Sequence, residues 1–363
     1  MTACIRPAAM TDGPRILDLI GRTPQRGLVT LNFERNPDFF IGARVSCEEP
    51  DVWVAEEEAG RLLAVFNIGH RTVFVNGTPR RIRYAHDLRI DPEARGTLLL
   101  HRMFRRLRRM LSDGEWMQTV ILAENRASIE TVGSGRAGLP RYYPCGDIET
   151  SLVSTSSARP RPGNGIEVSA ATAADLPALQ AFLDTEAPLR QFCPHYRLSG
   201  LLSDDSYFNG LLPGNYLLAR YAGRIVGVMG DWDQAAFKKT RVLSYPGALA
   251  WARPLYNALR PFTGGLRLPP AGGTLRYRML HTVLVHDQDP DVFRLLLEYQ
   301  RHAHRDTADA LVVGAFAGDP LLAGLRGLRR RTQRSHHYLV CYDGDPREQL
   351  RPGPVPHIDL ARL

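Results

Sequence analysis

The sequence contains almost no lysine, few cysteines and no long apolar run. Lys238 and Lys239 are the only lysines among 46 basic residues. The five cysteines are scattered without the paired spacing of a metal site, so we expect reduced thiols and no structural zinc. No apolar run approaches the ~18 residues of a membrane span, and the start has no basic-then-apolar leader. We therefore expect a cytoplasmic protein with no membrane partner.

Length and composition are typical of a globular chain with two domains. The 363 residues exceed one ordinary core, and 44% of them are hydrophobic and 23% charged. The net charge of +8 suits an acidic partner such as a nucleic acid, an anionic cofactor or an acidic carrier protein. The same arginine-rich composition is typical of a GC-rich genome, so the charge alone says little about function.

The stretch from the strand predicted at 86–90 into the following helix is the most informative part of the chain. Arg95, Gly96 and Thr97 form a loop after this strand, and a helix is expected to begin near Leu98. The free N–H groups of a helix start favour an anion, most simply a phosphate. An ordinary turn is the alternative interpretation.

This order of strand, Asp-Pro, Arg-Gly loop and helix resembles the signature of the GNAT superfamily of acyl-CoA-dependent N-acyltransferases. In that family the loop reads roughly Arg/Gln-x-x-Gly-x-Gly/Ala, and its amides bind the diphosphate of coenzyme A. Arg95 and Gly96 fit, whereas Leu98 and Leu100 occupy the later glycine positions and crowd the phosphates. The resemblance implies a donor that is acetyl-CoA or a longer acyl-CoA, or else an acyl carrier protein, and no metal.

The resemblance extends over the first 153 residues, because the predicted elements follow the order of a whole GNAT domain. The expected strands are 3–7, 52–55, 62–68, 73–75, 82–90, 117–123 and 148–153, and the expected helices are 11–20, one after 36–37, one from about 98, and 125–132. Asn125 fits the asparagine usual in the family, whereas Val132 replaces its frequent tyrosine. The predicted fold class is α/β, with a mixed, mostly antiparallel sheet flanked by helices.

A second copy of this pattern follows a linker at 154–165 that is rich in turn-forming residues. The repeated elements are a strand and helix from 166, a hairpin at 216–230, strands at 280–285 and 310–315, a helix at 292–303, and a closing strand at 338–342. We therefore predict two tandem GNAT-like domains, 1–153 and 166–343, with a tail at 344–363.

The second copy departs further from the family pattern. Its loop from His286 to Asp291 has three carboxylates and neither arginine nor glycine, so it would repel a diphosphate. A turn that caps the next helix is favoured there over a metal site. An insertion at 235–276 contains Trp251, Tyr256 and Phe262 and is expected to form a helix or lid against the domain interface.

The resemblance implies that the thioester carbonyl lies along the fourth strand, against the backbone amides of Leu88, Arg89 and Ile90. His86 and Asp87 come just before them, and regular alternation would point their side chains to opposite faces of the sheet. Histidine is the natural base, and aspartate would hold a cationic amine. Two partly exposed strand-end residues are the alternative.

Two further groups are candidates for chemistry. Tyr142 and Tyr143 are candidates to protonate the leaving thiolate, or they pack across a sheet edge. Asp231, Trp232 and Asp233 combine an aromatic face with two carboxylates, which suits a cationic acceptor, although a turn with a buried tryptophan fits equally well.

The sequence thus predicts an N-acyltransferase whose donor site is in the first copy and whose second copy shapes the acceptor cleft. The acceptor is expected to be a small-molecule or peptide amine. A non-catalytic GNAT-like binding module is one alternative. A nucleic-acid-binding protein using the basic face of the helix at 102–109 is another, but no aromatic-basic interleaving supports it.

Overall fold

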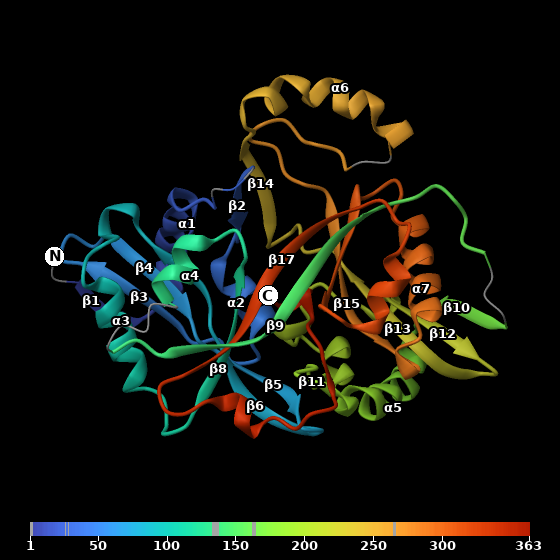
Figure 1. Ribbon diagram of the computed structural model, residues 1–363, viewed down its shortest axis with the longest axis horizontal. Helices are drawn as coiled ribbons and strands as arrows, with labels where there is room; N and C mark the ends of the chain where they lie inside the picture. The colour runs from blue at the N-terminus through green and yellow to red at the C-terminus, as the bar shows by residue number, and fades with distance from the viewer. Residues whose placement is uncertain (1–2, 26, 28, 133–137, 162–164, 264–265) are drawn as a thin grey trace.

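The computed structural model describes residues 3–25, 27, 29–132, 138–161, 165–263 and 266–363. Helices pack against the faces of extended, mostly antiparallel sheets, which is the mixed α/β class expected (Figure 1). Within these described ranges, no helix is both long and apolar enough to cross a membrane. The predicted linker includes 162–164, which lie outside the described residues.

The elements of the first half follow the predicted order, except that an unpredicted strand lies at 30–34 and the strand predicted at 82–90 is divided in two. They are β1 (Ala3–Pro7), α1 (Gly13–Arg22), β2 (Thr30–Glu34), α2 (Phe39–Ser46), β3 (Val52–Glu57), β4 (Leu62–Asn67), β5 (His70–Val75), β6 (Thr78–Tyr84), β7 (His86–Ile90), α3 (Leu99–Arg108), β8 (Trp116–Leu122), α4 (Arg126–Val132) and β9 (Arg141–Ser154). The turn between β5 and β6 has positive φ at Asn76 and Gly77, as an Asn-Gly hairpin requires. Helix α3 buries Met103, Phe104 and Leu107, at the three- and four-residue spacing of an amphipathic helix.

The elements of the second half repeat this order with an insertion. They are β10 (Ile166–Ala170), α5 (Leu176–Glu186), β11 (Arg190–Gln191), β12 (Tyr216–Tyr221), β13 (Arg224–Trp232), β14 (Lys239–Ser244), α6 (Gly247–Thr263), β15 (Tyr277–Val285), α7 (Pro290–Ala303), β16 (Ala310–Phe316), β17 (Arg330–Cys341) and β18 (Val355–Pro356). The insertion supplies β14 and α6, and β14 pairs antiparallel with β2 of the first half.

The two halves share one sheet. Its order in the described residues is β10-β12-β13-β15-β16-β9-β17-β8-β6-β5, and a smaller sheet has the order β1-β3-β4-β7. Strand β9 of the first half pairs with β16, and β17 of the second half pairs with β8. The structure thus differs from the expectation that the strand at 338–342 closes its own half. Backbone hydrogen bonds between strands are the same whichever half supplies the strand, so β17 can pair with β8 of the first half. The predicted domain boundaries stay a prediction.

The predicted tail at 344–363 ends inside the molecule. Leu360, Ala361 and Arg362 are all buried. Leu360 and Ala361 belong to the largest apolar cluster, and the guanidinium of Arg362 lies over the ring of Trp232 in the same cluster. The chain therefore finishes between the two halves, where it contacts the sites described next.

Candidate active site

In each half, two parallel neighbouring strands diverge partway along their length. In the first half, β6 pairs with β8 only through Arg83 and Tyr84, and the chain then continues as β7, which pairs with β4. In the second half, β15 pairs with β16 only over 277–279 and then with β13. Backbone groups that face such an opening have no strand partner on that side, so they are available to a ligand.

A histidine followed by a bulge marks both openings. Asp87 has a φ of 52° and Thr282 a φ of 48°, a region that residues with a side chain rarely adopt. The strand register shifts at both places, and His86 and His281 immediately precede the two bulges. The two halves therefore repeat one local geometry, of the kind that often accompanies functional sites.

The bulge of the first half brings His86 and Asp87 together. The Nδ1 atom of His86 lies 3.2 Å from Oδ2 of Asp87, and Arg35 Nη2 lies 3.2 Å from the other carboxylate oxygen. The His86 ring stacks on Tyr84 with 4.8 Å between centroids, and its Nε2 lies 3.8 Å from Sγ of Cys47. The expectation that these two side chains point to opposite faces is wrong, because the positive φ at Asp87 interrupts the alternation.

Burial and charge set the protonation of this cluster. Burial lowers the pKa of His86, although its hydrogen bond with Asp87 opposes the shift, so the imidazole is neutral at neutral pH. Burial would raise the pKa of Asp87, but the charge on Arg35 and the contact with His86 outweigh it and hold that pKa well below its usual value. Burial raises the pKa of Cys47 to about 12, so the sulfur remains a thiol. The cluster therefore contains one carboxylate, that of Asp87, which stays ionised at neutral pH.

Lys238 belongs to the second half, in the segment between β13 and β14, and its charge interacts with those of Arg35 and Asp87. Burial lowers its pKa to about 7, and the charge on Arg35 adds to the effect while that of Asp87 opposes it. Its Nζ donates to the carbonyl oxygen of Leu363. Sequence reasoning missed this residue as a site candidate, although its rarity as one of two lysines was a visible signal.

Two guanidinium groups near Asp87 have spare donors. Nη1 of Arg35 and Nε of Arg89 are buried without a hydrogen-bond partner among the described residues. Burial lowers the pKa of Arg89, but a guanidinium stays charged at any ordinary pH. Buried donors of this kind are normally satisfied, so these two groups suit a carbonyl or anionic ligand.

The predicted phosphate loop is exposed at the start of α3. Gly96 has a φ of 75° and no neighbouring atom within 4 Å of the position a Cβ would take. The Thr97 hydroxyl donates to the Ala94 carbonyl at 2.7 Å and accepts from the Leu99 amide at 3.2 Å, which caps the helix. Leu98 is 76% exposed and points away from the core. The loop is therefore open to an anion, as an acyl-CoA diphosphate would need.

The remaining predicted donor residues lie along β7 and at the start of α4. Arg89 and Ile90 lie opposite Val65 and Ala64 in the ladder with β4, and the bulge at Asp87 falls outside that register. The role of the Leu88, Arg89 and Ile90 amides toward the thioester carbonyl therefore stays a prediction. Asn125 accepts at Oδ1 from the amide of Ser128 at 3.3 Å and so supports the start of α4.

Tyr142 and Tyr143 lie in different apolar clusters on β9. The Tyr142 ring is 5.9 Å from that of Tyr338, and burial raises its pKa, which keeps the phenol protonated. The guanidinium of Arg347 lies 5.5 Å from the Tyr143 ring. No hydrogen bond in the described part of the chain joins either phenol to His86, so a role for them stays a prediction.

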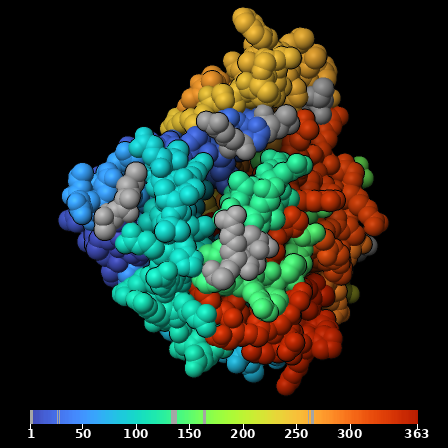
Figure 2. Space-filling view, turned by 60° about the vertical axis from the view of Figure 1, so that its left-hand side comes forward, coloured from blue at the N-terminus to red at the C-terminus, as the bar shows by residue number. Residues whose placement is uncertain are grey.

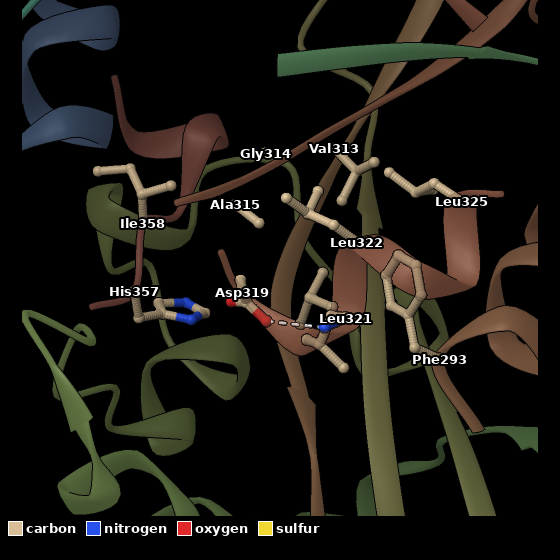
Figure 3. Close-up of a pocket in the computed structure, with 11 residues that line it drawn as sticks. Phe293, Val313, Gly314, Ala315, Asp319, Leu321, Leu322, Leu325, His357 and Ile358 are labelled. Atoms are coloured by element: carbon tan, nitrogen blue, oxygen red, sulfur yellow. Dashed lines mark hydrogen bonds between the residues drawn. The ribbon is translucent and has the colours of Figure 1, made fainter. Parts of the chain in front are cut away.

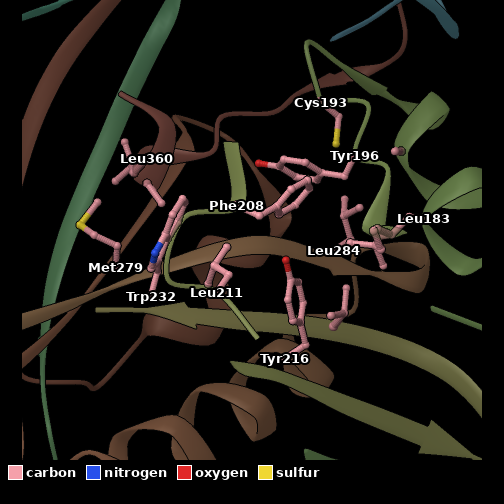
Figure 4. Packing of buried hydrophobic residues seen from close by; sticks show 14 of the residues in the cluster. Leu183, Cys193, Tyr196, Phe208, Leu211, Tyr216, Trp232, Met279, Leu284 and Leu360 are labelled. Carbon is pink, nitrogen blue, oxygen red and sulfur yellow. The ribbon is translucent and has the colours of Figure 1, made fainter. Parts of the chain in front are cut away.

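The predicted acceptor cradle is occupied by intramolecular contacts. Arg278 binds Asp231 at 2.7 Å and Asp233 at 3.3 Å, and His304 lies 3.3 Å from Asp231. Trp232 is fully buried, as Figure 4 shows, and its indole N–H is hydrogen-bonded inside the protein. The structure gives this cradle no support because its carboxylates are neutralised and its aromatic face is covered.

Comparison with known proteins reveals similarity in structure alone. No family model matches the sequence, and no curated protein matches it. A GCN5-related N-acetyltransferase from Sphaerobacter thermophilus is 14% identical with a TM-score of 0.57, over 99% of this chain and 98% of that one. Saccharomyces cerevisiae N-myristoyltransferase with bound myristoyl-CoA is 11% identical with a TM-score of 0.58, over 95% and 80%. This chain has the GCN5-related N-acyltransferase fold.

A third structure with this GNAT fold is a GCN5-related glucosamine N-acetyltransferase region in a fungal multi-domain β-N-acetylglucosaminidase. It is 12% identical with a TM-score of 0.60, over 93% of this chain and 38% of that one. The first and second comparisons extend over nearly the whole chain, so the likeness includes both halves. The resemblance predicted from the sequence is confirmed at the level of fold.

The opening in the second half of the GNAT fold is filled by the end of the chain. Asp359 accepts hydrogen bonds from the Thr282 amide at 2.9 Å and the Tyr196 hydroxyl at 2.6 Å. The Leu360 side chain occupies the space beside Gly314 where any Cβ would collide. A cavity that remains beside this segment is lined mainly by apolar side chains, with His357 and Asp319 at its edge (Figure 3).

The helix start in the second half is also occupied. Asp289 caps α7 by accepting from the amides of Asp291 at 2.8 Å and Val292 at 3.4 Å. The predicted capping turn is therefore present, and its carboxylate lies at the helix start, the place in the second half that corresponds to the predicted phosphate loop of the first. Among the described residues, no three histidine, cysteine or acidic side chains are grouped as metal ligands.

We expect Asp359→Ala to destabilise the protein by about 2–5 kcal/mol, because it leaves the Thr282 amide and the Tyr196 hydroxyl buried without an acceptor. Urea unfolding measures the loss. Asp345→Ala is the matched control, since Asp345 also caps a short helical turn through the Arg347 amide but is partly exposed. An equal loss in both variants would show that capping, rather than filling of the second opening, is the role of Asp359.

Proposed function

We propose that the chain transfers an acyl group from an acyl-CoA thioester to an amine, in the cleft of the first half. The observation that carries this proposal is the divergence of β7 from β8, which places an open bulge beside a buried carboxylate and leads into the exposed loop before α3. Backbone donors fixed in an opening of this kind stabilise the oxyanion of acyl transfer.

The donor is proposed to bind along the first-half cleft. The amides at Gly96 and Thr97 bind the diphosphate, with Arg95 beside them, and the bulge amides near Asp87 and Leu88 receive the thioester carbonyl. Acetyl-CoA and longer acyl-CoA thioesters share these contacts. Myristoyl-CoA is bound in the yeast N-myristoyltransferase named above, which supports a coenzyme A thioester without fixing the acyl length.

A carrier-protein donor has less support. Among the arginines of α3, Arg102 donates to the Ala3 carbonyl at 2.5 Å, Arg106 lies 5.1 Å from the Trp53 ring, and Arg108 is 3.5 Å from Asp343. These arginines contact the rest of the chain, so the helix is not a uniformly free basic surface. The same contacts weaken the nucleic-acid alternative.

The acceptor amine is proposed to enter beside Asp87 as an ammonium ion. The Asp87 carboxylate attracts the cation, because its contacts with Arg35, at 3.2 and 3.4 Å, are longer than the 2.7 Å bond between Arg278 and Asp231 and offset its charge less completely. Lys238 takes the proton, because an amine with a pKa of about 7 is partly neutral at neutral pH. The amine nitrogen then forms the C–N bond, the C–S bond breaks, and the nitrogen loses its second proton to solvent. The leaving thiolate takes one proton from solvent, and Lys238 releases the proton it accepted. His86 acts as a positioning residue, since both its ring nitrogens face protein groups.

We expect Gly96→Asp to weaken acyl-CoA binding at least about 100-fold, because its carboxylate would meet the diphosphate at the helix start. Isothermal titration with acetyl-CoA and longer acyl-CoA measures this loss. Gly96→Asn is the matched control: asparagine tolerates a positive φ and adds no charge, so its loss should stay below about 10-fold. Asp289→Ala, in the second half, should leave binding unchanged.

A reversed pattern, with binding lost in Asp289→Ala and kept in Gly96→Asp, would show that the donor site lies in the second half and not in the first. Release of free thiol from acetyl-CoA in the presence of polyamine, amino-sugar and peptide acceptors then separates an enzyme from a non-catalytic binding module. Binding without thiol release from any acceptor class would favour the binding module.

A further inference from the structure

Helix α6 in the insertion has its polar side turned toward the protein. Arg253, Asn257 and Arg260 recur at the spacing of one helix face. Asn257 exchanges two hydrogen bonds with the backbone of Leu268, at 2.9 and 3.0 Å, and Arg253 donates to the same carbonyl at 3.4 Å. Arg260 forms an ion pair with Asp309 at 3.1 Å. These bonds fix the rotation of α6 about its axis.

The opposite face of α6 is apolar and open to solvent. Trp251 is 88% exposed, Leu255 64%, Leu259 47% and Phe262 80%. A surface helix of a soluble protein normally has the reverse arrangement, with its apolar stripe against the core. A contiguous exposed stripe of large apolar side chains marks a contact surface.

The position of α6 leaves this stripe accessible. In Figure 1 the helix stands apart from the sheets, above β14, and in Figure 2 the same part of the chain projects from one end of the molecule. Arg329 donates to the carbonyl oxygen of Phe262 at 3.0 Å, which ties the end of the helix to the body. The apolar face is therefore held outward rather than left without support.

The charge around α6 is of one sign. The 53 residues from 234 to 286 include no aspartate or glutamate. Arg267 follows the helix and Arg329 contacts its end; both are exposed, and no ion pair joins either to a carboxylate in the described residues. An apolar stripe accompanied by arginines that form no ion pair complements a partner with an apolar interior and negative charges on its surface.

We propose that α6 lies on an anionic membrane surface, with its apolar stripe among the acyl chains near the headgroups and Arg267 and Arg329 against lipid phosphates. This is the arrangement of interfacial amphipathic helices. A second copy is a poorer fit, because one helix of about 25 Å offers a stripe well short of the ~800 Å² that each partner buries in a stable complex. The contact is peripheral, and the sequence-based expectation of no membrane partner considered spanning segments alone.

Tryptophan fluorescence tests this proposal on the full chain, because Trp251 is exposed whereas Trp53, Trp116 and Trp232 are each at most 7% exposed. Vesicles of phosphatidylglycerol and phosphatidylcholine should shift the emission to shorter wavelength and sediment the protein. Pure phosphatidylcholine vesicles should do so at least about 10-fold less well. Added salt should weaken the anionic binding.

Three variants sharpen the test. Leu255→Ser combined with Phe262→Ser should lower vesicle affinity at least about 10-fold and leave the folded-state circular dichroism unchanged, and Arg267→Glu should lower it as well. Leu202→Ser is the matched control, since Leu202 is 65% exposed outside the insertion, and its binding should equal that of the parent. The measurement needs no acyl donor, so its result is independent of the proposed catalytic function.

Two results would overturn the proposal. One is the absence of an emission shift and of sedimentation with anionic vesicles. The other is a dimer in sedimentation velocity without lipid that the Leu255→Ser and Phe262→Ser variant converts to a monomer, which would assign the stripe to a second copy of the chain. Equal binding to both vesicle types would remove the role given to the arginines and count against an anionic surface.

Discussion

Lys238→Met removes the acidic limb near pH 7 from the kcat profile and lowers kcat by about 10²–10⁴-fold, the range for loss of a general base. The substitution keeps an unbranched side chain of similar length and removes the basic amine. The limb belongs to Lys238 because burial brings its pKa to about 7, so the amine becomes the neutral base as pH rises through that value. The pH dependence of kcat, measured with an acceptor found in the thiol-release assay, checks this result.

Three companion variants separate the roles in the cluster. Lys239→Met is the matched control, next in sequence, and should keep both rate and profile. Asp87→Asn should raise KM for the acceptor and keep the limb, because it removes the charge that attracts the ammonium ion. His86→Gln should act in the same direction as Asp87→Asn. If His86→Gln alone abolished the limb, His86 would be the base and Lys238 a structural residue.

The sequence was sufficient to predict the local elements and their order. The strands at 3–7, 52–55 and 62–68 and the helix from about 98 each depend on nearby residues, so they could be recognised without the fold. The GNAT resemblance rested on the loop at Arg95 and Gly96 and on element order, and the comparison with solved structures confirms the fold.

The exchange of closing strands could not be predicted from the sequence. Strands β9 and β17 have patterns that suit either neighbouring edge, and the choice between β8 and β16 depends on the packing of the whole chain. The bulge at Asp87 could not be predicted from the sequence either. A single positive φ at a residue with a side chain does not change the alternation of apolar and polar residues, yet it brings the side chains of His86 and Asp87 into contact.

Contacts between distant segments determined the rest of the candidate site. Arg35 contacts Asp87, Cys47 contacts His86, and the charge of Lys238 interacts with that of Asp87; the three come from separate elements and none belongs to a recognisable motif. The Asp231 to Asp233 cradle stays a prediction without structural support. Its residue types suited a cation, but Arg278 had already neutralised the carboxylates. Residue chemistry alone therefore cannot separate a free carboxylate from one that is already paired.

Acidification from pH 6.5 toward pH 4 should unfold the protein steeply. Burial lowers the pKa of His281, His337 and His357 to about 4 each. In the unfolded chain each has a pKa near 6.5, so between these values the unfolded state binds about one more proton per histidine. Stability therefore falls as pH falls, by roughly 1.4 kcal/mol per pH unit for each histidine and about 4 kcal/mol for the three together. That slope exhausts a typical stability of about 5–15 kcal/mol within a few pH units.

Urea unfolding followed by circular dichroism between pH 7.5 and pH 4 measures this slope. His357→Leu should reduce it by about a third, because the His357 side chain makes no hydrogen bond in the described residues and lies beside an apolar cavity (Figure 3). His286→Gln is the control: its hydrogen bond with Glu186 raises the pKa of His286, which is 58% exposed, so its stabilisation is present at low pH and its loss cannot flatten the slope. Carboxylates with lowered pKa, such as Asp12 and Asp87, lose their contribution mainly below their ordinary pKa near 3.8, outside this window. A flat stability profile from pH 6.5 to 4.5 would contradict the prediction, since it would mean that these histidines are protonated without cost in the folded state.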